Sequence, residues 1–233
     1  MSNRVLVLRT VAADMRSYND FQYPESGFVE APDWDGGKDV CGGGLHGFLW
    51  GVGKGGLADW SESAKWLVLA VDPDDGLVEI TADGGGKCKF RRGEVVYCGD
   101  REGAAAYLDA HGAADKPVVG AIRQGGDYST LTGGDYSTLT GGDYSTLTGG
   151  DDSTLTGGYR STLTGGYRST LTGGDGSTLT GGDGSTLTWK IWDGQRWRLI
   201  VRYTDEGGIK ANTPYRWDSE KGEAVEVKME VNA

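Results

Sequence analysis

Residues 125–188 decide the fold, and they read GGDYSTLT, GGDYSTLT, GGDYSTLT, GGDDSTLT, GGYRSTLT, GGYRSTLT, GGDGSTLT and GGDGSTLT. The eight octads follow one another without interruption, and only their third and fourth positions vary. Self-similarity at a fixed short period is typical of solenoid proteins. Ser-Thr-Leu-Thr combines β-favouring residues with the alternation of a strand, whereas Gly-Gly permits a sharp corner. Each octad is therefore predicted to form one short strand and one corner.

Stacking lets the octads bury what a single octad cannot. Two octads per turn give a flattened coil with a strand on each side, so eight octads make four coils that rise about 19 Å. A serine column and a leucine column then face inward. The predicted inward leucines are Leu131, Leu139, Leu147, Leu155, Leu163, Leu171, Leu179 and Leu187.

Two other interpretations of the octads fit less well. A flexible Gly/Ser/Thr linker has no need of leucine at every eighth position. The calcium-binding nonapeptide solenoid has a period of nine with aspartate at the sixth position, whereas the aspartate here stands third in a period of eight.

Threonines occupy both outward positions of every predicted strand. They serve either as soluble β-formers, or as a regular lattice of hydroxyl and methyl groups that orders water or docks a partner. The residues concerned are Thr130, Thr132, Thr138, Thr140, Thr146, Thr148, Thr154, Thr156, Thr162, Thr164, Thr170, Thr172, Thr178, Thr180, Thr186 and Thr188.

Residues at the same position two octads apart become vertical neighbours in such a coil. We expect Tyr128 to stack on Tyr144, Arg160 to lie over Tyr144, and Arg168 to pair with Asp152. The third-position aspartates would repel one another unless they are solvated or met by a cation. The residues of these ladders are Tyr128, Tyr136, Tyr144, Tyr159, Tyr167, Arg160, Arg168 and Asp152, with Gly176 and Gly184 ending the two columns.

The octads resemble those of bacterial ice nucleation proteins, whose consensus is Ala-Gly-Tyr-Gly-Ser-Thr-x-Thr. Residues 157–172 are similar to the arginine-bearing coils near the C-terminal end of those solenoids. The resemblance covers the whole octad block and implies a β-solenoid whose outward Thr-x-Thr rows order water into an ice-like layer. It also implies end-to-end or side-by-side assembly in which the arginine coils take part. Glycine replaces the first-position alanine, tyrosine stands fourth in the first three units, and the array is short for a nucleator.

The flanks of the repeat suggest three segments: an N-terminal α+β capping domain (1–124), the β-solenoid (125–188) and a C-terminal β cap (189–233). The overall class is thus mainly β. In the cap, Asp193-Gly194 predicts a hairpin that pairs Trp192 with Trp197 or Trp189 with Ile200. Further short strands are expected at 214–217 and 224–227.

The N-terminal segment is expected to hold several strands and one helix. Strands are predicted at 5–10, 66–71 and 77–81, a hairpin at 88–90 and 95–98, and a helix at 100–111 that Asp100 caps and Gly112 ends. The hairpin would place Cys88 opposite Cys98, which makes a disulfide possible, although reduced thiols are the simpler interpretation.

Motifs in this segment are weak. Residues 51–56 match Gly-x-Gly-x-x-Gly but lack the strand and helix of a dinucleotide-binding fold. His46 lies in a Gly-rich stretch that vaguely resembles an uncharacterised bacterial and phage domain with a Gly-Phe-His-Ala-Cys motif, which often precedes repeat solenoids. Leu45 and Gly47 replace the Phe and Ala of that motif. The alternative function is therefore a small ligand-binding or enzymatic domain around His46 with the solenoid as its scaffold.

Composition narrows the function classes. The chain has 233 residues with a net charge of -11, which disfavours nucleic-acid binding. Eight Trp and eleven Tyr argue against wholesale disorder, and 18 of the 42 glycines mark octad corners. Three Cys and two His without a Cys-x-x-Cys motif predict neither a metal nor another cofactor.

The longest apolar run at the start, Val5–Leu8, is too short for a signal peptide or a membrane span. We therefore expect a cytoplasmic protein, with surface association left open. The predicted function is a non-enzymatic repeat scaffold that presents flat Thr-x-Thr arrays for self-assembly or for ordering water or ice. A homo-oligomer formed through solenoid edges or faces is expected.

Overall fold

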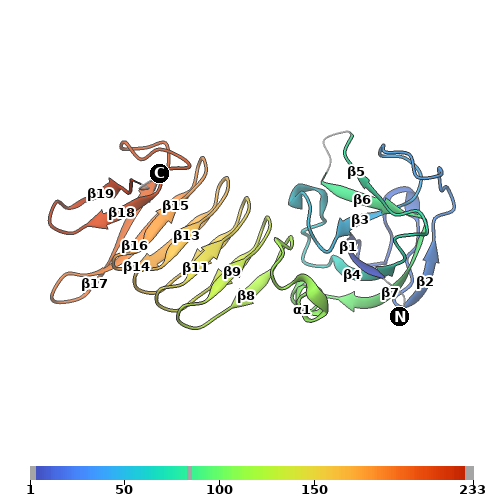
Figure 1. The fold of residues 1–233 in the computed structure, drawn as a ribbon, viewed down its shortest axis with the longest axis horizontal. Helices are drawn as coiled ribbons and strands as arrows, with labels where there is room; N and C mark the ends of the chain where they lie inside the picture. Colours follow the sequence, from blue (N-terminus) through green and yellow to red (C-terminus); the bar gives the residue numbers. More distant parts are fainter. Residues whose placement is uncertain (1–3, 83–85, 229–233) are drawn as a thin grey trace. The chain divides into compact units, whose positions relative to one another are not determined.

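The computed structural model describes residues 4–82 and 86–228, and the chain divides into two compact units, Met1–Val119 and Gly120–Ala233. The first unit is a curled antiparallel sheet with one α-helix, and the second is the solenoid (Figure 1). The sequence suggests a separate cap from residue 189. In the structure the strands of that segment extend the two sheets of the solenoid and belong to the second unit.

Among the described residues, the first unit contains seven strands in the order β2-β7-β4-β1-β3-β6-β5. Its centre is formed by two apolar runs, VLVLRTV and KWLVLAV, in each of which five of the seven residues are buried, as expected of strands covered on both faces. The strands are β1 (Val5–Val11), β2 (Gly27–Glu30), β3 (Leu45–Leu49), β4 (Lys65–Val71), β5 (Val78–Ile80), β6 (Lys87–Phe90) and β7 (Arg92–Gly99).

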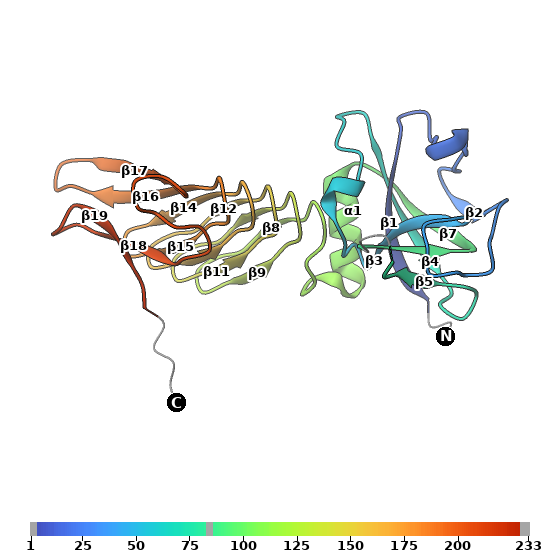
Figure 2. The same ribbon diagram turned by 90° about the horizontal axis from the view of Figure 1, so that it is seen from above.

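The predicted hairpin between residues 88–90 and 95–98 is wrong. Strand β6 pairs with β3 and β5, whereas β7 pairs with β2 and β4. Only Arg91 separates the two strands, and one residue is too short for a hairpin loop. Because β4, β1 and β3 lie between them in strand order, the sheet must curl so that its two ends approach, as Figures 1 and 2 show.

Cys88 and Cys98 do not form the considered disulfide in the structure. Cys88 is buried in the core of the first unit, and this burial, followed by the charge of Glu79, raises the pKa of its thiol to about 12. A thiol in this state is unreactive at neutral pH.

The helix of the first unit forms close to its predicted position, as α1 (Arg101–Leu108). The Asp100 carboxylate caps it by accepting a hydrogen bond from the Gly103 backbone N–H at 2.8 Å. A wider turn, η3 (Asp109–Ala113), follows, and the left-handed Gly112 lies within it. Two short 3₁₀ turns complete the unit, η1 (Tyr18–Asp20) and η2 (Gly55–Leu57). Within the described ranges, no helix is both long enough and apolar enough to cross a membrane.

The second unit consists of two sheets of six strands. The sheet that we call the β16 sheet contains β8 (Ile122–Gln124), β10 (Thr138–Thr140), β12 (Thr154–Thr156), β14 (Thr170–Gly174), β16 (Thr186–Trp192) and β17 (Trp197–Tyr203). The β15 sheet contains β9 (Thr130–Thr132), β11 (Thr146–Thr148), β13 (Thr162–Thr164), β15 (Thr178–Thr180), β18 (Tyr215–Asp218) and β19 (Glu223–Glu226).

Each octad strand pairs in parallel with the strand two octads away, as in Leu139 with Leu155 and Leu147 with Leu163. This register confirms the two-octad coil, and Figure 2 shows the successive coils as rungs between the two sheets. The leucine side chains fill the space between the sheets. Leu139 and the six octad leucines after it are fully buried, and Leu131 in the first coil is partly exposed.

Buried serines hold successive coils together by a repeated pair of hydrogen bonds. The Ser161 hydroxyl accepts from the Ser145 backbone N–H at 3.2 Å and donates to the Gly142 carbonyl at 3.1 Å. The same pattern recurs at each inner coil, so the buried hydroxyl and one buried N–H per octad satisfy each other.

A different side chain closes each end of the leucine column. At the start, Arg123 takes the place of a leucine opposite Leu139 and donates to the Thr132 carbonyl. At the other end, Trp189 is fully buried and its indole N–H donates to the Ser177 carbonyl at 3.0 Å.

The chain then returns through the hairpin β16–β17, in which Trp192 pairs with Trp197 and Trp189 with Ile200 as predicted. The Thr204 hydroxyl continues the serine ladder beyond the last octad, since it accepts from the Ser185 N–H at 2.8 Å. The predicted strands at 214–217 and 224–227 form as β18 and β19, and β18 pairs with β15.

Candidate functional site

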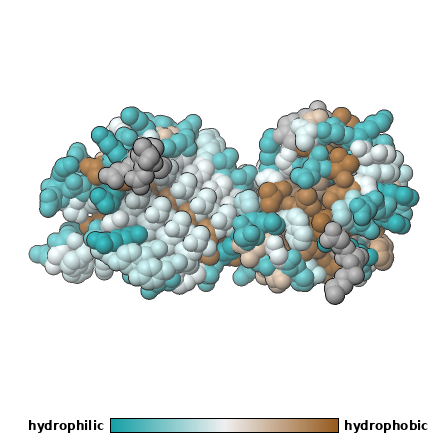
Figure 3. All heavy atoms as spheres, viewed as in Figure 1, coloured by the Kyte–Doolittle hydropathy of each residue, from teal (hydrophilic) through white to brown (hydrophobic). Residues whose placement is uncertain are grey.

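The candidate site consists of the two outward threonine faces, one on each sheet. Because Leu is directed inward in every Thr-Leu-Thr strand, the period of two places both threonines outward. Pairing in register then aligns them in rows, with Thr146 beside Thr162 and Thr154 beside Thr170. On the viewer's side of the solenoid, Figure 3 shows a broad surface of near-neutral hydropathy.

Exposure of the threonines varies along the rows. The exposed residues are Thr130, Thr140, Thr146, Thr148, Thr154, Thr156, Thr162, Thr164 and Thr170, and the half-buried ones are Thr132, Thr138, Thr172, Thr178, Thr180 and Thr186. Thr188 is buried, in register with Val201 of β17. The accessible lattice is therefore widest over the middle coils.

The third-position aspartates do not face one another as repelling charges. The Asp127 carboxylate accepts from the Asp143 backbone N–H at 2.9 Å, and the Asp143 carboxylate accepts from the Tyr159 N–H at 2.7 Å. The carboxylates of Asp127, Asp135, Asp143 and Asp151 thus each bind a backbone N–H of the coil that follows. This ladder, which satisfies corner N–H groups, could not be inferred from a charge pattern alone.

The fourth-position column is only partly as expected. Tyr128 and Tyr144 stack with their ring centroids 5.1 Å apart and their planes 4° from parallel. Arg160 lies over Tyr159 of its own octad at 5.1 Å rather than over Tyr144, so that expectation is wrong. The reason is that the Tyr159 ring packs edge-on against Tyr144 with centroids 5.6 Å apart and occupies that place.

In the second column the guanidinium of Arg168 lies 3.5 Å from the Asp152 carboxylate, as predicted. Arg168 also lies 5.7 Å from the ring centroid of Tyr167. The pKa of Tyr136 is raised above its usual value, first by loss of solvent and then by the charge of Asp152. All residues of the two columns adopt a left-handed backbone, which explains why Gly176 and Gly184 can replace them.

The two threonine faces end differently at the C-terminal side. Beyond Thr186 and Thr188, β17 adds the exposed side chains of Trp197, Leu199 and Tyr203 to the β16 sheet. Beyond Thr178, the β15 sheet continues with the exposed Arg216 of β18. The two faces are alike in sequence, but the border of the β16 sheet is mostly apolar, with Lys190 over Trp197 at 5.1 Å, whereas that of the β15 sheet carries Arg216.

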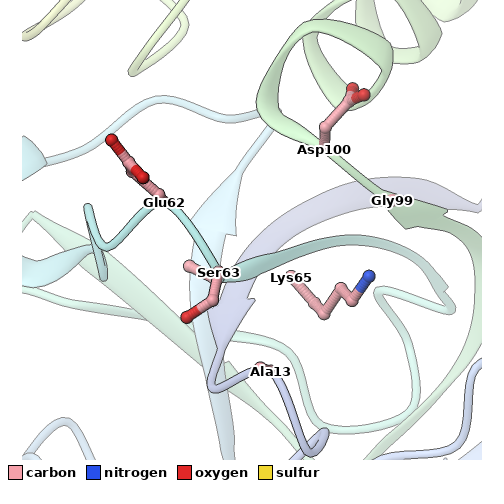
Figure 4. Close-up of a pocket in the computed structure, with 7 residues that line it drawn as sticks. Ala13, Glu62, Ser63, Lys65, Gly99 and Asp100 are labelled. Carbon is pink, nitrogen blue, oxygen red and sulfur yellow. The ribbon is translucent and has the colours of Figure 1, made fainter.

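The sequence motifs of the first unit do not form a nucleotide site. Residues 51–56 form a turn and the short η2, without the helix that would bind a phosphate. A cavity of about 570 Å³ lies beside α1, and Figure 4 shows that the Glu62, Lys65 and Asp100 side chains lining it do not converge. Across the described residues, no three His, Cys, Asp or Glu side chains gather as a metal ion would require.

Comparison with known proteins agrees with the repeat geometry. The chain is similar to bacterial ice nucleation proteins. It is 48% identical over 113 residues to ice nucleation protein InaU of Pantoea ananas, which covers 48% of this chain and 10% of that protein. It is 46% identical over 111 residues to an ice nucleation protein of Pseudomonas syringae, covering 48% and 9%. An ice nucleation protein of Xanthomonas campestris pv. translucens is 44% identical over 121 residues, covering 52% and 7%.

The chain spans a tenth or less of the length of these relatives. Each matched stretch is longer than the octad block at 125–188, so the similarity to ice nucleation proteins is not confined to the octads. No protein-family model matches the chain. No solved structure matches it either.

Proposed function

We propose that the solenoid is a non-enzymatic scaffold whose threonine faces bind and order water in an ice-like layer. The observation that carries the proposal is the register of the threonine rows, which repeats from one coil to the next without a shift. Neighbouring threonines are about 4.8 Å apart across strands and about 6.6 Å apart along them. Each face is thus a two-dimensional lattice of hydroxyl and methyl groups.

The threonines are well suited to hold such a lattice still. A β-branched side chain has few rotamers on a strand, so little entropy is lost when its hydroxyl binds an ordered water. The backbone beneath is fixed by strand pairing on both sides and by the buried serine ladder. The names of the relatives, ice nucleation proteins, support the same function.

Because the array is small, we expect a single chain to bind ice without nucleating it. Four coils give a face about 19 Å long, so we expect one chain to bind ice and slow its growth. Initiation of freezing requires a larger surface, which a single chain does not present.

The test is thermal hysteresis together with droplet freezing on the full chain. Replacing the exposed Thr146 and Thr162 by Lys places two long charged side chains on the middle of one face. The matched control places two lysines at exposed corners of the same solenoid, Asp175→Lys and Asp183→Lys. We expect the face variant to lose the share of the hysteresis that this face provides, with the β16 sheet keeping its own, and the corner variant to keep all of it. Absence of hysteresis in the native chain, or equal loss in both variants, would refute the proposal.

We also propose that copies associate through the apolar border of the β16 sheet. Strand β17 is an edge strand, and its Leu199 is 66% exposed beside the exposed Trp197 and Tyr203. Edge strands with apolar side chains readily pair with another chain. Light scattering should show a dimer or larger species that Leu199→Lys converts to a monomer, whereas Val40→Lys in the first unit leaves the mass unchanged. A monomeric native chain would refute the association.

A further inference from the structure

A groove in the first unit, separate from the threonine faces, has a volume of about 1530 Å³. It is lined by β1, the start of β3 and the loops that precede β2 and β3. Three nitrogen-bearing side chains come from three strands to its wall: Arg9 from β1, His46 from β3 and Lys87 from β6.

The Arg9 guanidinium has an unused edge. Its Nη1 donates to the His46 carbonyl at 3.0 Å, whereas its Nε is buried and has no hydrogen-bond partner. Nε and Nη2 form the side of a guanidinium that holds a carboxylate or phosphate with two parallel hydrogen bonds. No group of the described residues takes either of these two nitrogens. A buried N–H without a partner is costly, and a bound oxyanion would remove that cost.

Lys87 adds a second unused donor, and His46 lies beside it. The Lys87 ammonium contacts the Cys41 sulfur at 3.0 Å, and no carboxylate among the described residues lies within ion-pair distance of it. The buried Nε2 of His46 likewise has no partner. Burial, followed by the charges of Lys87, Arg9 and Lys89, lowers the pKa of His46 to about 4. The imidazole is therefore neutral at pH 7, and the charges that act on it most are all positive.

The acidic side chains of the groove are already engaged. Asp14 and Asp20 lie beside Arg16, at 3.6 and 3.7 Å. The Asp33 carboxylate accepts from the Gly44 N–H at 3.1 Å, and that of Asp59 accepts from the Ser61 N–H at 2.9 Å. The acidic groups thus neither pair with Arg9 and Lys87 nor fill the space beside them.

Part of the remaining wall is apolar. Phe21, Leu45, Phe48 and Leu57 line the same groove, and Leu57 exposes 53% of its surface. Ligand sites typically combine such a wall with a few convergent polar groups.

We propose that this groove binds a small organic oxyanion, with its carboxylate or phosphate on Arg9 and Lys87, beside His46, and its apolar body along Phe48 and Leu57. The proposal concerns the first unit alone and is independent of the function proposed for the solenoid.

The test is calorimetric titration of the full chain with benzoate, phenyl phosphate, inorganic phosphate and phenol. We expect benzoate or phenyl phosphate to bind with a dissociation constant below 1 mM. The headgroup that binds more tightly then identifies the class of ligand. Inorganic phosphate, which lacks the apolar body, and phenol, which lacks the charge, should each bind at least tenfold more weakly. If no probe saturates below 10 mM, or if phenol binds as tightly as benzoate and phenyl phosphate, the proposal is wrong.

Variants assign the binding to the named side chains. Lys87→Gln should weaken binding of the better probe at least tenfold, whereas Lys38→Gln, an exposed lysine outside the groove, should change it less than twofold. Arg9→Gln should abolish binding, but it also removes the bond to the His46 carbonyl, so Lys87 decides the question if that variant fails to fold. Saturating probe should also raise the pKa of His46, measured by NMR of its ring proton. Unchanged affinity in Lys87→Gln, or an unmoved His46 titration, would overturn the assignment.

Discussion

The solenoid and the first unit satisfy their buried polar groups in different ways. In the solenoid the partner of a polar group recurs at a constant separation, 16 residues for the serine N–H bonds and 19 for the serine hydroxyl bonds. In the first unit each partnership is unique. The fully buried Lys89 ammonium, for example, binds the Asp35 carboxylate 54 residues away, at 2.8 and 2.9 Å, and the Val40 carbonyl at 3.0 Å. Repetition therefore distributes stability evenly over the solenoid, whereas the first unit depends on single contacts.

The largest expected loss of stability comes from truncating a buried leucine of the solenoid. Leu155 and Leu163 are fully buried on opposite sheets in nearly identical surroundings. Replacing either one by Ala should reduce stability by about 2–5 kcal/mol, and the two losses should agree within about 0.5 kcal/mol. Amide hydrogen exchange resolved by peptide measures both, with residues 4–119 as the internal reference. Losses that differ twofold between the two sheets would contradict the even distribution.

The next largest loss of stability is expected where β3 lies close against β1 in the first unit. A Cβ at Gly47 would collide with Val7 Cγ1 and lie 2.6 Å from the Leu8 carbonyl oxygen. Gly47→Ala should therefore cost about 1–3 kcal/mol. At Gly56 no atom lies within 4 Å of the place that a methyl group would take, so Gly56→Ala should change stability by less than about 0.5 kcal/mol. Urea unfolding followed by exchange in residues 4–119 compares them, and equal costs would show that the strand contact is looser than described.

The contrast between repeated and unique contacts explains which features can be predicted from the sequence. The two-octad coil, the leucine column, the Tyr128–Tyr144 stack and the β16–β17 hairpin follow from spacing alone, because each is repeated or local. The octad spacing did not predict the position of Arg160, because Tyr159 of the same octad packs against the Tyr144 ring in its place. The role of Thr204 was also missed, since it copies an octad serine from outside the repeat.

In the first unit, sequence spacing predicted elements better than their partners. The strand at β1 and the helix capped by Asp100 are local features, and both are confirmed. The pairing of β6 with β3 joins segments far apart in sequence, so no local pattern announces it. The alternation Lys-Cys-Lys-Phe at residues 87–90 suggests solvent-facing lysines, yet Lys89 is buried because Asp35 and Val40 reach it from a distant loop.

The serine ladder gives a smaller effect that tests whether the cap behaves as another octad. Ser161→Ala removes the acceptor of the buried Ser145 N–H. Thr204→Val removes the nearer acceptor of the Ser185 N–H, which keeps the Gly182 carbonyl at 3.3 Å. Ser161→Ala should cost about 1–2 kcal/mol, and Thr204→Val should cost less, because the Ser185 N–H keeps one acceptor. Ser219→Ala, at an exposed turn, is the matched control and should be neutral. A Thr204→Val variant as stable as the native chain would show that the cap does not continue the ladder. Exchange of the two named amides is the direct measurement.

Acid should weaken the two units over different ranges of pH. The pKa of His46 lies at about 4 in the folded chain against 6.5 in an unfolded one. Between these values the unfolded chain binds the proton and the folded chain does not, so the stability of the first unit is full above pH 6.5 and falls as the pH drops towards 4. In the solenoid, backbone N–H groups of Arg196 and Gln195, followed by Arg198, lower the pKa of Asp193 to about 2, so its contribution is lost only as the pH falls from 3.8 towards 2.

Amide exchange measured from pH 7 to 4.5 should therefore show the first unit weakening while the solenoid holds. Both histidines of the chain belong to the first unit, which supplies a matched pair of variants. His46→Gln should flatten the pH dependence, because it removes the buried imidazole whose pKa is lowered, and His111→Gln should keep it. A slope that survives in His46→Gln would place the titrating group elsewhere.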